Sequence, residues 1–283
     1  MVVTARPGRG PWGMSSRSAI RRGIQDRALR FGADVCAFGA EWIEALYPNL
    51  CPLCGALAEG LGCEQHQLVH DADGSPGGPR CRRCFERLAT LLPDESLCAA
   101  CRRDGSLPRV RALFDYHEDP VARDWILALK HRSRADLAEP LGALMAARFR
   151  VLEPTARDIV CLPVPAHPLR RFERGYDQAW LLARSLARCL GADARALRGL
   201  RRGRWTSPQG APGARSRASN VRGAFRLVRR WRDQLVGKHL WLIDDVVVSG
   251  ASVRACRDAL REAAPASVSV LALARAERRG RGP

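Results

Sequence analysis

From about residue 109 onward, short apolar runs alternate with longer segments in which apolar residues recur every three or four positions. The short runs predict strands over 110–114, 159–164, 239–243 and 268–272. The longer segments predict amphipathic helices over 122–131, 138–152, 177–190 and 253–264. Such alternation is typical of a parallel sheet flanked by helices, so we expect an α/β domain over residues 106–276.

The N-terminal part of the chain lacks this alternation. Residues 1–26 are rich in Arg, Gly and Ser, which predicts a disordered basic tail, and we expect a second disordered tail at 277–283. The region 27–50 carries an apolar helical face that stops before Pro48, so it predicts a helix packed on the protein. Residues 51–105 contain few large apolar side chains and predict a small separate domain without a sufficient hydrophobic core.

The spacing of the cysteines indicates how this small domain folds without a sufficient hydrophobic core. Three pairs with two intervening residues lie within it: Cys51 and Cys54, Cys81 and Cys84, Cys98 and Cys101. No secretory signal is visible, so these pairs indicate zinc ligands rather than disulfides. A structural zinc contributes on the order of 10 kcal/mol to the folding of small fingers. We therefore expect a zinc-ribbon-like domain.

The sequence indicates a metal, but it leaves open which cysteines bind it. We predict one site formed by Cys51, Cys54, Cys81 and Cys84, with the second pair opening a helix. Cys98 and Cys101 either replace one pair or hold a second ion, and Cys63 lies nearby. His66 and His70 are expected to be loop histidines in solvent. Four further cysteines lie in apolar surroundings and are expected to be buried: Cys36, Cys161, Cys189 and Cys256.

The chain is strongly basic, with a net charge of +18 and a pI near 10.7. Such a charge favours a polyanionic partner such as nucleic acid. However, Lys130 and Lys238 are the only lysines among the 47 basic residues, so the excess is almost entirely arginine. Compositional bias explains part of the charge equally well, and both interpretations stay open.

A candidate phosphate site follows the predicted strand at 239–243. The strand runs into Asp244 and Asp245, then into a turn of small residues before a helix: Val246, Val247, Val248, Ser249, Gly250, Ala251 and Ser252. The turn and the helix N-terminus direct backbone N–H groups at one point, which favours a phosphate. Two adjacent carboxylates fit a sugar with vicinal hydroxyls attached to that phosphate. We therefore predict a site for a ribose 5-phosphate group.

This segment resembles the signature of type I phosphoribosyltransferases, an apolar strand followed by two acidic residues, two aliphatic residues and a Thr-Thr-Gly-x-Thr turn. Ser249 and Ser252 replace two of the threonines and keep the hydroxyl donors. Val248 stands where the first threonine is usual and loses one donor. The resemblance implies a type I phosphoribosyltransferase-like fold.

A second segment, residues 163–178, resembles the Pro-x-Pro-x-His-Pro…Glu-Arg-Gly-aromatic-Asn-Gln motif of ComF-type proteins, with Asp177 at the usual Asn position. Further residues fit the spacing of that family: Phe114, Tyr116, Ile126, Leu129, Lys130, Thr206, Gln209, Arg217, Asn220, Val221, Ala224 and Phe225. A cysteine-rich domain in front is also similar to that family. The resemblance covers roughly residues 27–275.

The ComF resemblance implies a protein of DNA uptake that binds 5-phosphoribosyl 1-diphosphate, with single-stranded DNA and a competence helicase as partners. An active phosphoribosyltransferase is the alternative, with Mg²⁺ as cofactor and an acceptor that the sequence does not name. In that alternative Asp244, Asp245 and Arg174 are the catalytic residues, and Arg170 and Arg171 bind diphosphate. Lys130 is either a point charge at this site or an ordinary surface lysine.

Other classes lack support in the sequence. The GxGxxG spacing at residues 8–13 lies in the predicted basic tail and follows no predicted strand, so it does not indicate a dinucleotide fold. A GxxxxGK[ST] run is absent, which argues against a nucleoside triphosphatase loop. No apolar run is long enough to span a bilayer. With no export signal visible, we expect a cytoplasmic protein. The loop at 201–220 has no clear periodicity, and loops of this length are usually functional or mobile.

Overall fold

The computed structural model describes residues 50–58, 62–68, 79–88, 97–131, 133–203, 221 and 223–276. The predictions for the two tails, for the helix at 27–49, for Cys36 and His70 and for the loop at 204–220 lie outside these residues. Thr206, Gln209, Arg217 and Asn220 of the family motif lie outside them as well.

The centre of the protein is a sheet of five strands in the order β1-β7-β6-β2-β3, and every neighbouring pair is parallel. The strands are β1 (Arg109–Asp115), β2 (Ile159–Pro163), β3 (Ala194–Ala196), β6 (His239–Val247) and β7 (Ser267–Arg275). Two further short strands, β4 (Leu200–Arg202) and β5 (Phe225–Leu227), form a separate antiparallel pair. The predicted parallel sheet flanked by helices is confirmed.

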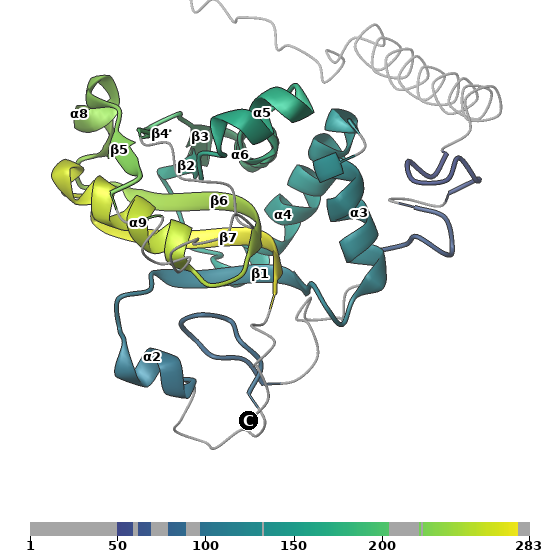
Figure 1. The fold of residues 1–283 in the computed structure, drawn as a ribbon, viewed down its shortest axis with the longest axis horizontal. Coiled ribbons are helices and arrows are strands. Elements are labelled where there is room, and N and C mark those ends of the chain that lie inside the picture. The colour runs from purple at the N-terminus through teal and green to yellow at the C-terminus, as the bar shows by residue number, and fades with distance from the viewer. Residues whose placement is uncertain are drawn as a thin grey trace, which may run out of the picture.

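Helices cover both faces of this sheet (Figure 1). They are α2 (Ala99–Arg103), α3 (Pro120–His131), α4 (Ala138–Leu152), α5 (Pro168–Arg174), α6 (Gln178–Leu190), α8 (Arg232–Leu235) and α9 (Ala251–Leu260). Single 3-10 turns occur at Ala135–Leu137, Gly191–Asp193, Arg229–Trp231 and Arg261–Ala263. Among the described helices, none has the length and apolar character needed to cross a bilayer.

Alternation along the central strands divides the core into two parts. In β6, Trp241 and Ile243 pack with α3, α4 and α6, whereas Leu240 and Leu242 pack with α9 and the β4–β5 pair. The physical reason is the two-residue period of a strand, which sends successive side chains to opposite faces. The same alternation decides where the two aspartates that follow will point.

The main difference from the predicted elements is the length of β6. The apolar pattern ends at Ile243, but the strand continues through the acidic residues to Val247, since Asp244 pairs with Ala272 and Val247 with Arg275 of β7. Pairing with β2, by contrast, ends at Ile243. Beyond that residue β6 therefore has a strand neighbour on one side only, and the other side is open for a ligand.

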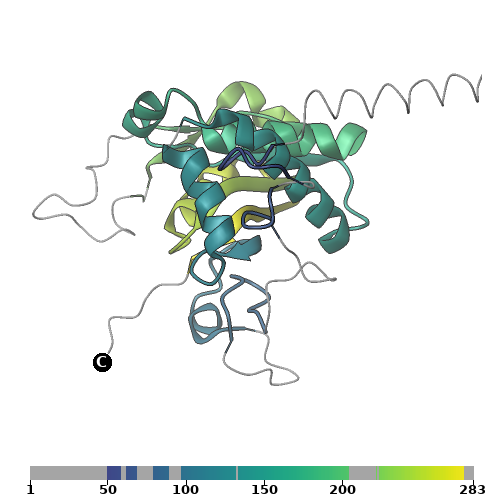
Figure 2. The ribbon, with the colours of Figure 1, turned by 90° about the vertical axis from the view of Figure 1, so that its right-hand side faces the viewer.

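The cysteine-rich segments lie at two separate places (Figures 1 and 2). The described residues 50–58 and 62–68 lie beside α3, where Trp125 Nε1 donates to the carbonyl oxygen of His66 at 3.0 Å. The segment 80–88 and helix α2 lie beneath β1, where Val110 N donates to Arg83 O at 2.7 Å. The division of the chain at residues 51–105 stays a prediction.

Candidate functional site

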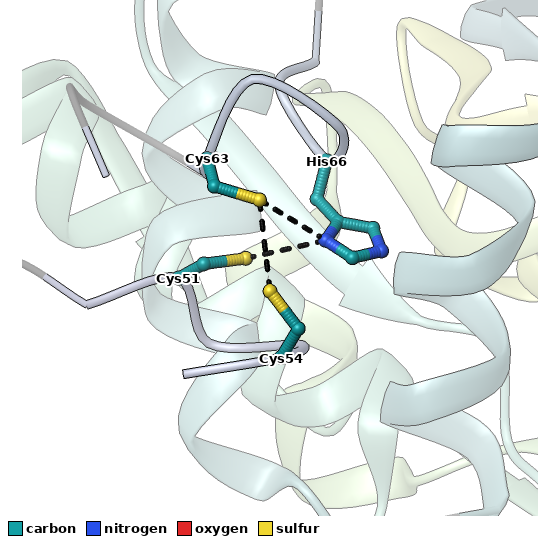
Figure 3. A group of neighbouring side chains, drawn as sticks. All are labelled: Cys51, Cys54, Cys63 and His66. Carbon is teal, nitrogen blue, oxygen red and sulfur yellow. Dashed lines mark hydrogen bonds between the residues drawn. The ribbon is translucent and has the colours of Figure 1, made fainter. Parts of the chain in front are cut away.

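The described cysteines form two groups of four metal-ligand residues, each with ligand atoms within 4.8 Å of one another. One group is Cys51, Cys54, Cys63 and His66, and the other is Cys81, Cys84, Cys98 and Cys101. We refer to them as the first cluster and the second cluster. In the first cluster, three sulfur atoms and the ring of His66 point toward one another (Figure 3).

The spacing of the ligand atoms fits a tetrahedral ion such as zinc. A zinc–sulfur bond of about 2.3 Å places two sulfur ligands roughly 3.8 Å apart at the tetrahedral angle. Cys54 Sγ lies 3.6 Å from Cys63 Sγ, and His66 Nδ1 lies 3.3 Å from Cys63 Sγ. In the second cluster, Cys84 Sγ lies 3.5 Å from Cys98 Sγ. Both donor sets, Cys₃His and Cys₄, are ones that structural zinc sites use.

Backbone N–H groups stabilise a thiolate in each cluster. Burial raises the pKa of Cys51, but the backbone amides of Cys63, Cys54 and Leu53 lower it more, to about 6. The pKa of Cys81 falls to about 7 in the same way, against the effect of burial, and Cys98 N donates to its sulfur at 3.3 Å. A thiolate at neutral pH is the form that binds a metal.

The predicted grouping of these ligands is wrong. Cys51 and Cys54 do not share a site with Cys81 and Cys84, because the two pairs lie in different clusters. His66 is a member of the first cluster rather than a solvent-exposed loop histidine. The two-residue spacing of Cys63 and His66 was a signal that sequence reasoning missed.

The second cysteine pair also fails to open a helix. Phe85 has a left-handed backbone with φ of 62°, and its N–H donates to Cys81 O at 2.9 Å, closing a tight turn. Arg80 and Arg87 then pair across that turn. The helix in this cluster is α2, which begins directly after Cys98.

A cavity of about 930 Å³ lies at the carboxyl ends of the central strands. Segments far apart in the sequence line it: Tyr116 after β1, Lys130 at the end of α3, nine residues between Val164 and Gln178, and every residue from Asp244 to Val253. From β2 the chain passes through α6 to β3, and from β6 it passes through α9 to β7. These two connections run in opposite directions along the sheet, so the strand order reverses between β2 and β6. Ligands of open α/β sheets bind at such a switch point.

The two acidic residues occupy different environments in this cavity. Asp245 is 5% exposed, and its carboxylate is held by Lys130 Nζ at 3.2 Å and Gln178 Nε2 at 3.1 Å. Asp244 is half-buried and lies on the opposite face of β6, where its Oδ1 accepts from Asp245 N at 2.9 Å. A ligand that contacts both carboxylates must therefore straddle the open edge of β6.

The electrostatics of Asp244 follow from this position. Burial, and then the charge of the adjacent Asp245, raise the pKa of Asp244 well above its usual range. Asp244 is therefore held in its protonated form more readily than a surface carboxyl group, and an approaching cation or hydroxyl changes that balance.

The turn from Val248 to Ser252 presents main-chain donors to the cavity. Ala251 N donates a hydrogen bond to Ser249 Oγ at 3.3 Å. Within the described residues, the N–H groups of Ser249, Gly250 and Ser252 donate to no protein atom. Gly250 has φ of 70°, a left-handed backbone that favours glycine, and a Cβ there would lie 2.6 Å from Leu107 Cδ1 and displace that side chain.

Cationic side chains surround the same cavity. Arg170 and Arg174 of α5 and Arg202 of β4 line it, together with His131. Burial, followed by the charges of Arg174 and Lys130, lowers the pKa of His131, which favours the neutral ring. Arg171 is exposed and does not line the cavity, in contrast to its predicted diphosphate role. Lys130 lies at the cavity and not at an unrelated surface.

Gln178 is the cavity residue that sequence reasoning left without a role. It begins α6 directly after the N-cap Asp177, whose side chain accepts from Trp180 N. This cap fixes the first turn of α6 beside β6, and the 6% exposed Gln178 reaches Asp245. The cysteines expected outside the clusters behave as predicted for Cys161 and Cys256, which are buried, while Cys189 is half-buried.

Comparison with known proteins gives relatives that are named for DNA utilization and for competence. The chain is 30% identical over 210 residues to DNA utilization protein YhgH of Salmonella typhimurium, covering 69% of this chain and 88% of that protein. It is 32% identical over 116 residues to competence protein F of Haemophilus influenzae, covering 41% of this chain and 49% of that protein. No protein-family model matches the chain.

Among solved structures, the allosteric regulatory enzyme of purine biosynthesis is similar at 20% identity with a TM-score of 0.34. The likeness covers 52% of this chain and 30% of that one.

Proposed function

This chain belongs to the family of DNA utilization protein YhgH and competence protein F, and from that relationship we propose that it serves DNA uptake or use by binding 5-phosphoribosyl 1-diphosphate. The observation that carries the ligand is that Asp244 and Asp245 line the same cavity as Ser249, Gly250 and Ser252, whose N–H groups donate to no atom of the described residues. The carboxylates suit the hydroxyl groups of a sugar, and the backbone N–H groups suit a phosphate. A phosphorylated pentose therefore fits this site better than free phosphate or an unphosphorylated sugar does.

Each part of the ligand has a partner in the proposed complex. The N–H groups of Ser249, Gly250 and Ser252 bind the 5-phosphate at the start of α9. Asp244 accepts from a ribosyl hydroxyl, while Lys130 and Gln178 hold Asp245 for a second hydroxyl. Arg170 and Arg174 face the diphosphate, whose oxygens a guanidinium group binds in pairs.

Magnesium fits this ligand through the diphosphate. Among the described residues, the only groups of three or more metal-ligand side chains are the two cysteine-containing clusters, so a protein-only magnesium site is not formed there. Mg²⁺ commonly binds through one or two carboxylates together with substrate phosphates, and Asp244 and Asp245 are the candidates here. When bound, the ion would neutralise charge on the diphosphate.

A more specific proposal is that the protein transfers the phosphoribosyl group to an acceptor. In that reaction the bond between ribose C1 and the diphosphate oxygen breaks, the electron pair leaves with diphosphate, and an acceptor lone pair forms the new bond to C1. Arg170 and Arg174 would stabilise the departing charge, and Asp244 and Asp245 would position the sugar.

Titration calorimetry with 5-phosphoribosyl 1-diphosphate and Mg²⁺ tests the ligand. We expect Asp244→Asn to weaken binding about tenfold to a hundredfold, the effect of one hydrogen bond to a charged group. Asp258→Asn is the matched control, since Asp258 lies on α9 but does not line the cavity. Equal affinity in Asp244→Asn and the parent protein would remove the ribose assignment. Diphosphate release with a panel of bases then separates an enzyme from a binding protein.

A second candidate function, binding of single-stranded DNA, is favoured by helix α5. None of its residues is buried, and Phe172 is 87% exposed between Arg170, Arg171 and Arg174. An exposed aromatic ring among arginines suits base stacking beside a phosphate backbone. The competence helicase implied by the resemblance stays a prediction.

Fluorescence anisotropy with a labelled oligothymidine tests this surface. We expect Phe172→Ala to weaken binding about tenfold, since stacking of one base contributes about 1–3 kcal/mol. Val151→Ala is the matched control, because Val151 is an exposed apolar side chain on α4. If both variants bind as the parent protein does, α5 is not the DNA surface.

A further inference from the structure

Arg275, the last residue of β7, connects the second cluster with the loop that follows β6. Its side chain is buried, at 4% exposure for the residue. On one side, Nε donates to Cys84 O at 3.0 Å and Nη2 to Glu86 Oε2 at 2.8 Å. On the other side, Nη1 donates to Val247 O at 2.9 Å and also to Val248 O. One guanidinium group therefore donates hydrogen bonds both to a residue of the second cluster and to the start of the candidate phosphate loop.

The chemistry of this position requires arginine. A guanidinium group has five donors in a rigid plane, so it can reach carbonyl groups on two sides at once. Its buried charge is compensated by Glu86, the partner in an ion pair. A lysine ammonium is a point charge and cannot span Cys84 and Val247 with the same geometry.

An apolar contact joins the same two parts independently. Leu107 follows α2 of the second cluster and packs directly against Gly250, where a Cβ would lie 2.6 Å from Leu107 Cδ1. Cys81, Cys84, Cys101 and Leu107 belong to the same buried core as Val247 and Val253. The second cluster and the loop are thus packed as one body.

The first cluster has different neighbours. The carbonyl oxygen of His66 accepts from Trp125 Nε1, and that of Pro52 accepts from Arg134 Nη1. Its Leu68 belongs to the core on the α3 and α4 side of the sheet. Among the described residues, no hydrogen bond of the first cluster reaches residues 247–252.

We propose that Arg275 is a positioning residue, through which metal bound at the second cluster holds the 248–252 loop in its ligand-binding conformation. Metal fixes the turn that carries Cys84 O and Glu86, and that turn fixes the guanidinium group. The guanidinium group in turn holds the carbonyl oxygens of Val247 and Val248. Occupancy of the second cluster therefore sets affinity for a phosphorylated ligand, whereas the first cluster does not; this last step rests on the proposed function.

Hydrogen–deuterium exchange on the full-length zinc-loaded protein tests the coupling without any ligand. The reporters are the amide of Arg254, which donates to Gly250 O, and that of Ala276, which donates to Val247 O. In Cys98→Ser, which removes a ligand of the second cluster, we expect both amides to exchange at least about tenfold faster. Cys54→Ser, the matched change in the first cluster, should leave them unchanged.

Two further variants separate positioning from general stability. Arg275→Lys should keep both metals and still accelerate exchange at the two reporter amides, because the bridge is lost while the clusters remain. Glu86→Gln should act in the same direction with a smaller change, since it removes only the compensating charge. Amides of β2 serve as the internal control for global unfolding in every variant. Unchanged reporters in Cys98→Ser after metal loss, or equal acceleration in Cys54→Ser, would overturn the proposal.

Calorimetry with 5-phosphoribosyl 1-diphosphate and Mg²⁺ completes the test. We expect Cys98→Ser and Arg275→Lys to bind it at least about tenfold more weakly than Cys54→Ser. If the parent protein does not bind this ligand, the proposed function fails while the exchange result still decides the coupling. If the parent binds and all variants bind equally, the coupling fails while the proposed function stands.

Discussion

The two cysteine clusters use the same local turn but stabilise different parts of the protein. In each, the first cysteine carbonyl accepts from the residue four positions on, at 2.8 Å for Gly55 and 2.9 Å for Phe85. Both of these residues have a left-handed backbone, with φ of 75° and 62°. The first turn uses glycine, which adopts this conformation at little cost, whereas the second uses phenylalanine, which does not.

The reason for that difference lies in the surroundings. Phe85 is 7% exposed and belongs to the core shared with the candidate phosphate loop, and Arg80 lies over its ring at 5.8 Å from the centroid. A Cβ at Gly55 would meet nothing within 4 Å. The second turn thus accepts backbone strain in exchange for packing, and the first has no packing to gain. We infer that the second cluster is the more closely integrated with the rest of the domain.

Loss of metal is expected to give the largest effect. Metal analysis of the purified protein should find about two zinc ions per chain, one for each cluster. Cys84→Ser should release one of them and lower the free energy of unfolding by on the order of 5 kcal/mol, part of what a structural zinc contributes.

Cys189→Ser is the control for this experiment, because Cys189 lies outside both clusters. It should keep both ions. A parent protein that folds with one zinc would show that one of the two donor sets is not a metal site, and one that folds with none would show that neither is.

Substitutions at the left-handed residues of the two turns are expected to lower stability by intermediate amounts, for different physical reasons. Phe85→Gly relieves left-handed strain worth about 1–2 kcal/mol but removes a buried ring worth about 3–5 kcal/mol, for a net loss of about 1–4 kcal/mol. Gly55→Ala adds strain alone and should cost about 1–2 kcal/mol. Urea unfolding of both variants measures the difference. A stabilising Phe85→Gly would mean that the ring contributes little packing, and the contrast between the turns would fail.

Sequence patterns predicted the sheet and helices well because they depend on local periodicity. The strands at 110–114, 159–164 and 268–272 and the four main helices follow from which side chains are apolar, and packing in the structure keeps them. The apolar pattern could not predict that β6 continues through Asp244 and Asp245, since its hydrogen bonds to β7 do not require apolar side chains. Consequently the opposite orientation of the two carboxylates was not predicted either.

The candidate site was predicted where one continuous segment forms it and missed where distant residues complete it. Asp244 to Ser252 and Lys130 do line one cavity. Arg275 lies 191 residues from Cys84, and no local pattern marks a buried arginine at the end of a strand. The grouping of cysteines failed for a similar reason, because spacing identifies pairs but not which pairs meet in space.

The cavity differs from the clusters in its effect on stability, because ionised Asp244 destabilises the fold whereas the cluster cysteines stabilise it. The pKa of Asp244 is raised in the folded protein by burial and by Asp245, so below its unfolded pKa both states are protonated and there is no cost. As pH rises above that value, the unfolded chain ionises first and stability falls. Asp244→Asn removes this cost, so it should raise the free energy of unfolding at pH 8 and have little effect near pH 4. Urea unfolding at the two pH values measures this effect. A loss of stability at pH 8 would mean that Asp244 supports the fold, as the cysteines do, rather than being kept in the cavity for a ligand.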